Sequence, residues 1–164
     1  MANSITYTPQ AIDLAEIKAF CRVDGSADDS LLTFLYEAAC EEALSYAHVV
    51  LGSATITADT VWVSSYELPY WPAGSITSVH VYVDGVSTED TEYEILDGVI
   101  TPSIGSEGER MVIVYTAGFA AMPKDLKHAI YQRVKFGFDF GDDMPYDKSR
   151  FFDRIVGRYR RNFA

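Results

Sequence analysis

The clearest pattern of apolar and polar positions lies in residues 110–140, where a strand pattern gives way to a helical one. Residues 111–115 form a continuous apolar run rich in β-branched side chains, which is typical of a buried strand, although a buried helical turn gives the same run. Apolar residues then recur at helical spacing over 126–138. Pro123 suits the first position of that helix, which needs no N–H donor. We therefore expect a buried strand, a bend at Gly118 and a helix.

Two helical patterns come earlier in the chain. Thr8 and Pro9 have the character of an N-cap and a first helical residue, and the apolar face that follows runs to about Val23. A second, alanine-rich pattern covers residues 30–50, and Gly52 is suited to ending it. Both segments place their apolar residues on one face, so we expect both helices to pack against a core.

The middle of the chain has the spacing of short strands, in residues 61–63, 76–83, 93–96 and 99–101. Asp84-Gly85 and Asp97-Gly98 are hairpin turn signals. Residues 68–72 contain two prolines, which excludes a central strand there. The predicted fold class is therefore α+β: a helical bundle of about four helices with a small, mainly antiparallel β-sheet inserted between helices 2 and 3.

The C-terminal segment, residues 142–164, has the pattern of a break followed by a basic amphipathic helix, and we separate it from a core domain of residues 1–141. Such a helix can dock on a partner protein, on nucleic acid or on an anionic membrane, or pack on its own domain. Its arginines recur at nearly every fourth position, and aromatic and aliphatic residues occupy another side. The candidate interface residues are Arg150, Phe151, Phe152, Arg154, Ile155, Arg158, Tyr159 and Arg161.

Charge is unevenly distributed along the 164 residues, whose formal net charge is −11. Eleven of the 13 Lys and Arg residues lie from Arg110 onward, so an acidic body carries a basic end. This asymmetry favours a charged partner for the end and repulsion of anions by the body, although plain solubility explains it equally well. No apolar run approaches the length of a membrane span, and the N-terminus lacks the pattern of a signal peptide.

Chemical motifs are not recognisable in the sequence. There is no phosphate-binding loop, zinc-protease motif, nucleophile elbow or paired CxxC, and the three histidines are scattered. The glycine-rich loop at 105–109 is acidic, which is wrong for holding phosphate. Cys21 and Cys40 are isolated and favour packing over a disulfide. We therefore expect no catalytic, cofactor or metal site and no enzyme, although a site assembled between subunits would leave no such motif.

Three segments, taken in order, resemble a known family. The first is Lys18–Asp24, followed by Asp28, Asp29 and Leu31 ahead of the alanine-rich helix; the second runs from Leu68-Pro69 to Ile76–Val79. The third is Val114–Phe119 followed by Pro123–Ile130. Their order and spacing resemble the head–tail connector proteins of long-tailed bacteriophages, which are also called head-completion or adaptor proteins.

The resemblance implies a structural virion protein at the head–tail interface, assembled in the host cytoplasm. It implies a homo-oligomeric ring, typically a dodecamer, that binds the portal and the next head-completion or tail-terminator protein. Genomic DNA would pass through the ring without sequence-specific binding, and no cofactor or membrane is implied. We expect the C-terminal residues to contact the portal or a neighbouring subunit, and residues 64–73 and 103–109 to become ordered on binding. The alternative is a nucleic-acid-binding module that uses the same basic helix.

Overall fold

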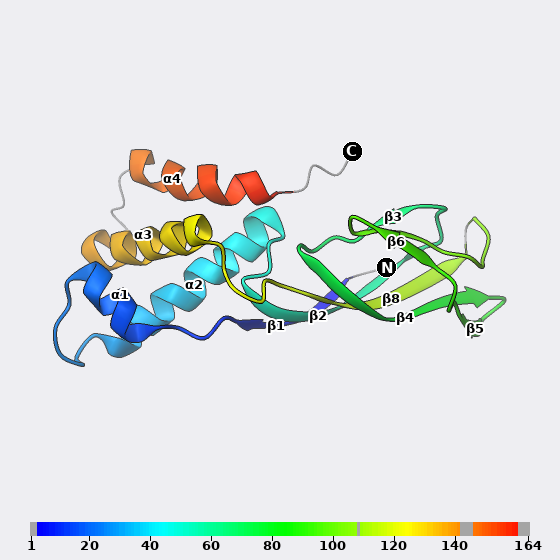
Figure 1. Ribbon diagram of the computed structural model, residues 1–164, viewed down its shortest axis with the longest axis horizontal. Helices are drawn as coiled ribbons and strands as arrows, with labels where there is room; N and C mark the ends of the chain where they lie inside the picture. The colour runs from blue at the N-terminus through cyan, green and yellow to red at the C-terminus, as the bar shows by residue number, and fades with distance from the viewer. Residues whose placement is uncertain (1–2, 108, 142–145, 161–164) are drawn as a thin grey trace. The chain divides into compact units, whose positions relative to one another are not determined.

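The computed structural model describes residues 3–107, 109–141 and 146–160 (Figure 1). These residues form two compact units, each built from separate chain segments. The β unit contains residues 3–8 and 53–118, and the helical unit contains residues 9–52 and 119–160. The predicted α+β class with about four helices is confirmed. Within the described residues, strands β2 to β8 lie between α2 and α3 as expected, but β1 precedes α1, so the predicted insertion is only partly right.

The β unit contains two sheets. The larger has the strand order β1-β2-β8-β4-β5, and the smaller has the order β3-β7-β6. Strand β8 pairs antiparallel with both β2 and β4, and β4 pairs antiparallel with β5. The strands are β1 (Ser4–Pro9), β2 (Gly52–Val61), β3 (Tyr66–Glu67), β4 (Ala73–Val83), β5 (Val86–Glu89), β6 (Glu94–Leu96), β7 (Val99–Thr101) and β8 (Arg110–Ala117).

Strand β8 is the central strand of the larger sheet, as the apolar run in the sequence predicts. Its residues alternate: Met111, Ile113 and Tyr115 are fully buried, whereas the residues between them are half-buried. The hydroxyl of Tyr115 accepts a hydrogen bond of 3.0 Å from the backbone N–H of Tyr70. Burial raises the pKa of Tyr115, and this effect outweighs the lowering by the hydrogen bond from Tyr70. The central strand therefore also holds the proline-rich loop in place.

Both predicted hairpin turns are confirmed. Asp84 and Gly85 have φ of 49° and 79°, and Asp97 and Gly98 have φ of 50° and 75°. Two successive residues with positive φ form the turn that matches the twist of paired strands. The first turn joins β4 to β5 and the second joins β6 to β7, so β5 and β6 become the outermost strands of their sheets.

The loop after β7 is held by several hydrogen bonds, whereas its composition suggested that it would become ordered on binding. The carboxylate of Asp90, which is 2% exposed, accepts hydrogen bonds from the backbone N–H groups of Glu92, Ser103 and Ile104 and from the Ser103 hydroxyl. The indole N–H of Trp62 donates to the Ile104 carbonyl at 2.7 Å. A buried carboxylate needs hydrogen-bond donors around it. The composition of the loop does not show that Asp90 takes these donors from it, and therefore does not show that the loop is held.

The helical unit contains α1 (Leu14–Cys21), α2 (Asp29–Ala47), α3 (Lys124–Phe140), α4 (Tyr146–Val156) and a 3₁₀ turn, η1 (Gly157–Tyr159). The prediction that the first helix begins at Thr8 and Pro9 is wrong, because both belong to β1. A residue before proline avoids the helical region. Asp13 supplies the cap instead, and its side chain accepts from the N–H of Glu16 at 3.0 Å. Pro123 is the N-cap of α3 rather than its first residue.

Helices α2 and α3 form the core of this unit (Figure 1). Helix α2 ends at Ala47, earlier than predicted, because His48 adopts a left-handed conformation with φ of 55°. The helices approach closely at Gly137, where an added Cβ would lie 2.9 Å from Leu35 Cδ2. Cys21 and Cys40 are buried thiols and do not form a disulfide with each other. Within the described ranges, no helix combines the length and the apolar character needed to cross a membrane.

Candidate protein-interaction site

The apolar side of α4 packs on its own helical unit. Phe152 is 2% exposed, Ile155 is 7% exposed and Val156 is fully buried. Helix α4 contacts α3 and, to a smaller extent, α2, and runs alongside α3 in Figure 1. Among the possibilities that an amphipathic helix leaves open, packing on the chain's own domain therefore accounts for this side. Phe152 and Ile155, both predicted interface residues, are not available to a partner in this structure.

Aromatic contacts fix α4 and the turn after it. The ring of Phe151 lies edge-on to that of His128, with 5.6 Å between their centroids, and the ring of Tyr159 lies edge-on to that of Phe119 at 6.1 Å. The Tyr159 hydroxyl donates a hydrogen bond of 2.7 Å to Asp125 in the first turn of α3. Burial and then this hydrogen bond raise the pKa of Tyr159 to about 12. The hydroxyl therefore stays protonated at neutral pH, and the contacts hold α4 at its middle and at the turn after it.

Replacing Tyr159 with phenylalanine should cost about 1 kcal/mol of unfolding free energy, because a hydrogen bond to a carboxylate is lost while the ring contact stays. Urea unfolding of Tyr159→Phe, Asp125→Asn and the double variant forms a cycle that isolates the pair. The double variant should be less destabilised than the two single changes added together. Additive losses would show that this hydrogen bond does not hold the end of α4.

The basic side of α4 faces away from the helical unit. Arg150, Arg154 and Arg158 are all exposed. Arg150 and Arg154 lie four apart on α4 and therefore on one side of it, and Arg158 follows in η1. We term these three residues the arginine ridge. The guanidinium of Arg154 lies 5.7 Å from the centroid of the Phe151 ring, which is itself half-buried. Arg161 lies outside the described residues. The structure therefore groups three of the four predicted arginines on one accessible surface.

The β unit carries most of the net negative charge of the chain. Its segments contain ten Asp and Glu residues against one Arg, a formal charge of −9. That arginine, Arg110, is already paired: its Nε and Nη2 each lie 2.9 Å from an oxygen of Asp59. The hydrogen bond from Arg110 lowers the pKa of Asp59. The sequence indicates an acidic body, but it does not show that the acidity gathers in one structural unit.

Many of these carboxylates lie on one stretch of edge strands. All residues of β5 and of β6 are exposed. We term the exposed residues of Asp84–Asp97 the acidic edge; its carboxylates belong to Asp84, Glu89, Glu92, Glu94 and Asp97. Large apolar side chains lie on the same stretch, with Val86 66% exposed and Leu96 76% exposed. The sequence-based prediction placed no interface residue here, although two hairpin turns next to alternating acidic and apolar residues were the available signal.

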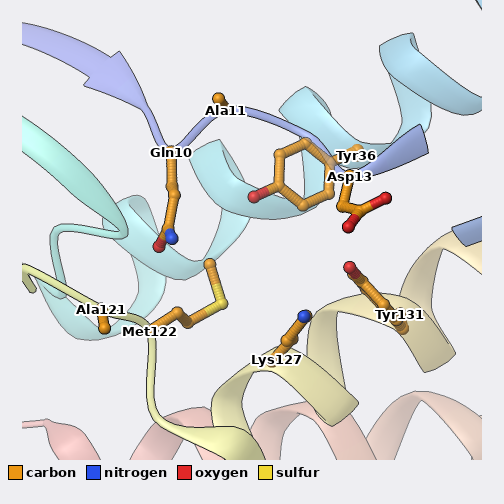
Figure 2. Close-up of a pocket in the computed structure, with 8 residues that line it drawn as sticks. All are labelled: Gln10, Ala11, Asp13, Tyr36, Ala121, Met122, Lys127 and Tyr131. Carbon is orange, nitrogen blue, oxygen red and sulfur yellow. The ribbon is translucent and has the colours of Figure 1, made fainter. Parts of the chain in front are cut away.

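A hollow of about 330 Å³ in the helical unit is a candidate for a reaction site (Figure 2). Figure 2 shows the side chains of Gln10, Tyr36 and Lys127 directed into it. The Lys127 amine pairs with the carboxylate of Glu16, and the Tyr131 hydroxyl donates to the same carboxylate at 3.1 Å. Burial, the larger cause, and this hydrogen bond raise the pKa of Tyr131, so the hydroxyl keeps its proton at neutral pH.

The hollow therefore offers ion pairing without a nucleophile and an oriented base, the arrangement that covalent catalysis needs. Among the described residues, no group of three His, Cys, Asp or Glu side chains is placed to hold a metal ion. The side-chain oxygen of Gln10 is buried without a hydrogen-bond partner in the described part of the chain.

Comparison with known proteins gives a family match over part of the chain and fold matches over nearly all of it. Residues 11–69 match the family described as phage gp6-like head-tail connector protein. The whole chain also matches a solved chain in the neck of an empty gene transfer agent (GTA) particle computed with C6 symmetry, with a TM-score of 0.80, 19% identity, and coverage of 100% of this chain and 97% of that one.

Two further solved structures share the fold. A chain in the virion of a native GTA particle matches with a TM-score of 0.76, 21% identity, and coverage of 100% and 97%. A chain in the neck of a native GTA particle computed with C12 symmetry matches with a TM-score of 0.70, 19% identity, and coverage of 98% and 97%. A comparison with curated proteins finds no match. The resemblance to head–tail connector proteins is thus confirmed by the family match over residues 11–69 and by a whole-chain fold shared with neck chains of gene transfer agent particles.

Proposed function

We propose that this protein is a structural component of a virion neck, where it forms a ring adaptor between the portal and the tail. The observation that carries the proposal is the fold match to a GTA neck chain, which runs over 100% of this chain and 97% of the other. The family match over residues 11–69 supports the same role independently. The C6 and C12 symmetries of the matched neck structures support a ring, and a dodecamer in particular.

The charge distribution suits a ring through which DNA passes. Phosphate attraction to basic residues dominates the affinity of proteins for DNA. A β unit with a formal charge of −9, whose single arginine is paired with Asp59, lacks that attraction. Genomic DNA would therefore move along the channel without sequence-specific binding. The ring would act by shape, extending the channel and offering a surface to the next head-completion or tail-terminator protein.

The proposed contact surface on the helical unit is the arginine ridge with the half-buried Phe151 and Tyr159, and Arg161 remains part of the proposal. Arginine and aromatic residues are enriched at the energetic centres of protein interfaces. Phe152 and Ile155 take a different role, because they are buried and hold α4 in place. Deleting the segment after residue 143 would expose the core beneath these two residues, so single substitutions of exposed arginines give a cleaner test.

A second function has one observation in its favour: the three exposed arginines of the ridge, on α4 and in η1, could follow a phosphate backbone. In that case the chain would be a nucleic-acid-binding module. Its affinity for duplex DNA should then fall steeply as salt concentration rises.

Parallel binding measurements separate the two functions. Purified chain should bind purified portal and should give no mobility shift with duplex DNA even at low salt, because the acidic β unit repels phosphate. Duplex binding with a steep salt dependence, together with no portal binding, would overturn the adaptor proposal in favour of the second function. A shift that persists in Arg154→Glu would show that α4 is not the DNA-binding element.

A further inference from the structure

We propose that the arginine ridge of one copy docks on the acidic edge of the β unit of the next copy. The inference rests on the proposed ring and adds which two surfaces meet. Two exposed features of the chain belong neither to its core nor to the hollow of the helical unit. They are the basic arginine ridge and the acidic stretch that contains the edge strands β5 and β6.

The ridge is built as a rigid donor surface. Buried Phe152 and Val156 hold α4 on the helical unit, and the Tyr159–Asp125 hydrogen bond attaches the turn after α4 to α3. An α-helix rises about 1.5 Å per residue, so Arg150 and Arg154 on α4 are separated by roughly 6 Å along the axis. Arginine binds carboxylates through two parallel hydrogen bonds and, because its planar head is preorganised, loses little freedom on pairing. A fixed row of guanidinium groups therefore matches a surface with several carboxylates.

The acidic edge is suited to accept such a row. Strands β5 and β6 are the outermost strands of their sheets, so each presents a side without a strand partner among the described residues. Glu89, Glu92 and Glu94 are exposed along this stretch. Among them, Ile95 is 44% exposed and Leu96 is 76% exposed. Exposed apolar side chains that are grouped and rimmed by polar ones mark interaction sites.

A second copy is the occupant that the charges favour. Arg110, the one Lys or Arg in the segments of the β unit, is already paired with Asp59. Both the ridge and the acidic edge are exposed in the isolated chain, so its described residues cover neither surface. Because the two surfaces differ, contact between them joins copies head to tail. Repeated head-to-tail contacts close into a ring when the rotation allows it, which a two-fold contact cannot do.

Charge reversal in two complementary variants tests this pairing. One variant carries Arg150→Glu, Arg154→Glu and Arg158→Glu; the other carries Glu89→Lys, Glu92→Lys and Glu94→Lys. Sedimentation velocity at low ionic strength should show self-association at least about tenfold weaker for each variant alone, because like charges then face each other across the interface. An equimolar mixture should associate again, with the two variants alternating around the ring. Recovery in the mixture shows that both variants are folded.

A single-site comparison provides the matched control. Arg154→Glu should weaken association, whereas Lys124→Glu, an equal charge change at an exposed position in the first turn of α3, should leave it unchanged. Wild-type association should also weaken with added salt. A ridge-reversed chain that associates as well as wild type, or a mixture that stays monomeric, would overturn the inference. Normal self-association combined with lost portal binding would also overturn it and assign the ridge to the portal. None of these three results would contradict the adaptor proposal, which fails only if the wild-type chain does not bind portal.

Discussion

Asp90→Ala is expected to lower the free energy of unfolding by about 3 kcal/mol, because it leaves several buried donors without a partner. The carboxylate is 2% exposed and accepts hydrogen bonds from three backbone N–H groups, those of Glu92, Ser103 and Ile104, and from the Ser103 hydroxyl. These bonds join the loop before β6 to the loop after β7. Urea unfolding at neutral pH measures the loss. Removal of a neighbouring exposed carboxylate in Glu89→Ala should change stability by less than about 0.5 kcal/mol.

The same carboxylate should make stability depend on pH. Burial alone would raise the pKa of Asp90, but the hydrogen bonds from Ser103, Glu92 and Ile104 outweigh it and hold the pKa below its usual value. A folded-state pKa below the unfolded value of about 3.9 gives stability that is present above the unfolded pKa and is lost as pH falls through the folded pKa. The difference in unfolding free energy between wild type and Asp90→Ala should therefore become smaller as the pH falls into the acid range. If this difference does not change with pH, the ionised form of Asp90 does not stabilise the fold.

Gly105→Ala is expected to cost about 3 kcal/mol, from combined overpacking and backbone strain. A Cβ at this position would lie 2.5 Å from Trp62 Cδ1 and 2.9 Å from Val81 Cγ1, and Gly105 has φ of +108°. The indole of Trp62 cannot simply move aside, because its N–H donates to the Ile104 carbonyl at 2.7 Å. Thermal or urea unfolding, followed by tryptophan fluorescence, should report both the lost stability and the displaced indole.

Gly85→Ala separates strain from crowding. Gly85 also has a positive φ, +79°, but a Cβ there would meet no atom within 4 Å. A non-glycine residue in the left-handed region costs about 1–2 kcal/mol, so this variant should lose only that amount. Equal losses at the two glycines would show that the contact with Trp62 adds nothing.

Local patterns predicted the elements whose determinants are adjacent in the sequence. The Asp-Gly turns, the alternating strand ending at Val83 and the helix after Pro123 all depend on a few neighbouring residues. The first helix was misplaced because Thr8 and Pro9 look like a cap and a helix start, yet pairing within the sheet places them in β1. Strand pairing depends on distant residues, so a single stretch of sequence cannot reveal it.

The candidate surface was predicted in part for a similar reason. Helical spacing correctly separates exposed Arg150, Arg154 and Arg158 from the apolar residues. The same spacing fits a helix that docks on a partner and one that packs on its own unit. It therefore could not show that Phe152 and Ile155 are buried against their own helical unit. The acidic edge was missed because the sequence does not show that β5 and β6 are the outermost strands of their sheets, which only the sheet order defines.

The central claim is that the protein works as a ring seated on a portal. Electron microscopy of purified chain mixed with purified portal tests it most directly, with portal alone as the control. Class averages of the mixture should show an additional closed ring on one end of the portal with rotational symmetry. Portal particles that look the same with and without the chain, under conditions where the chain is folded, would contradict the account.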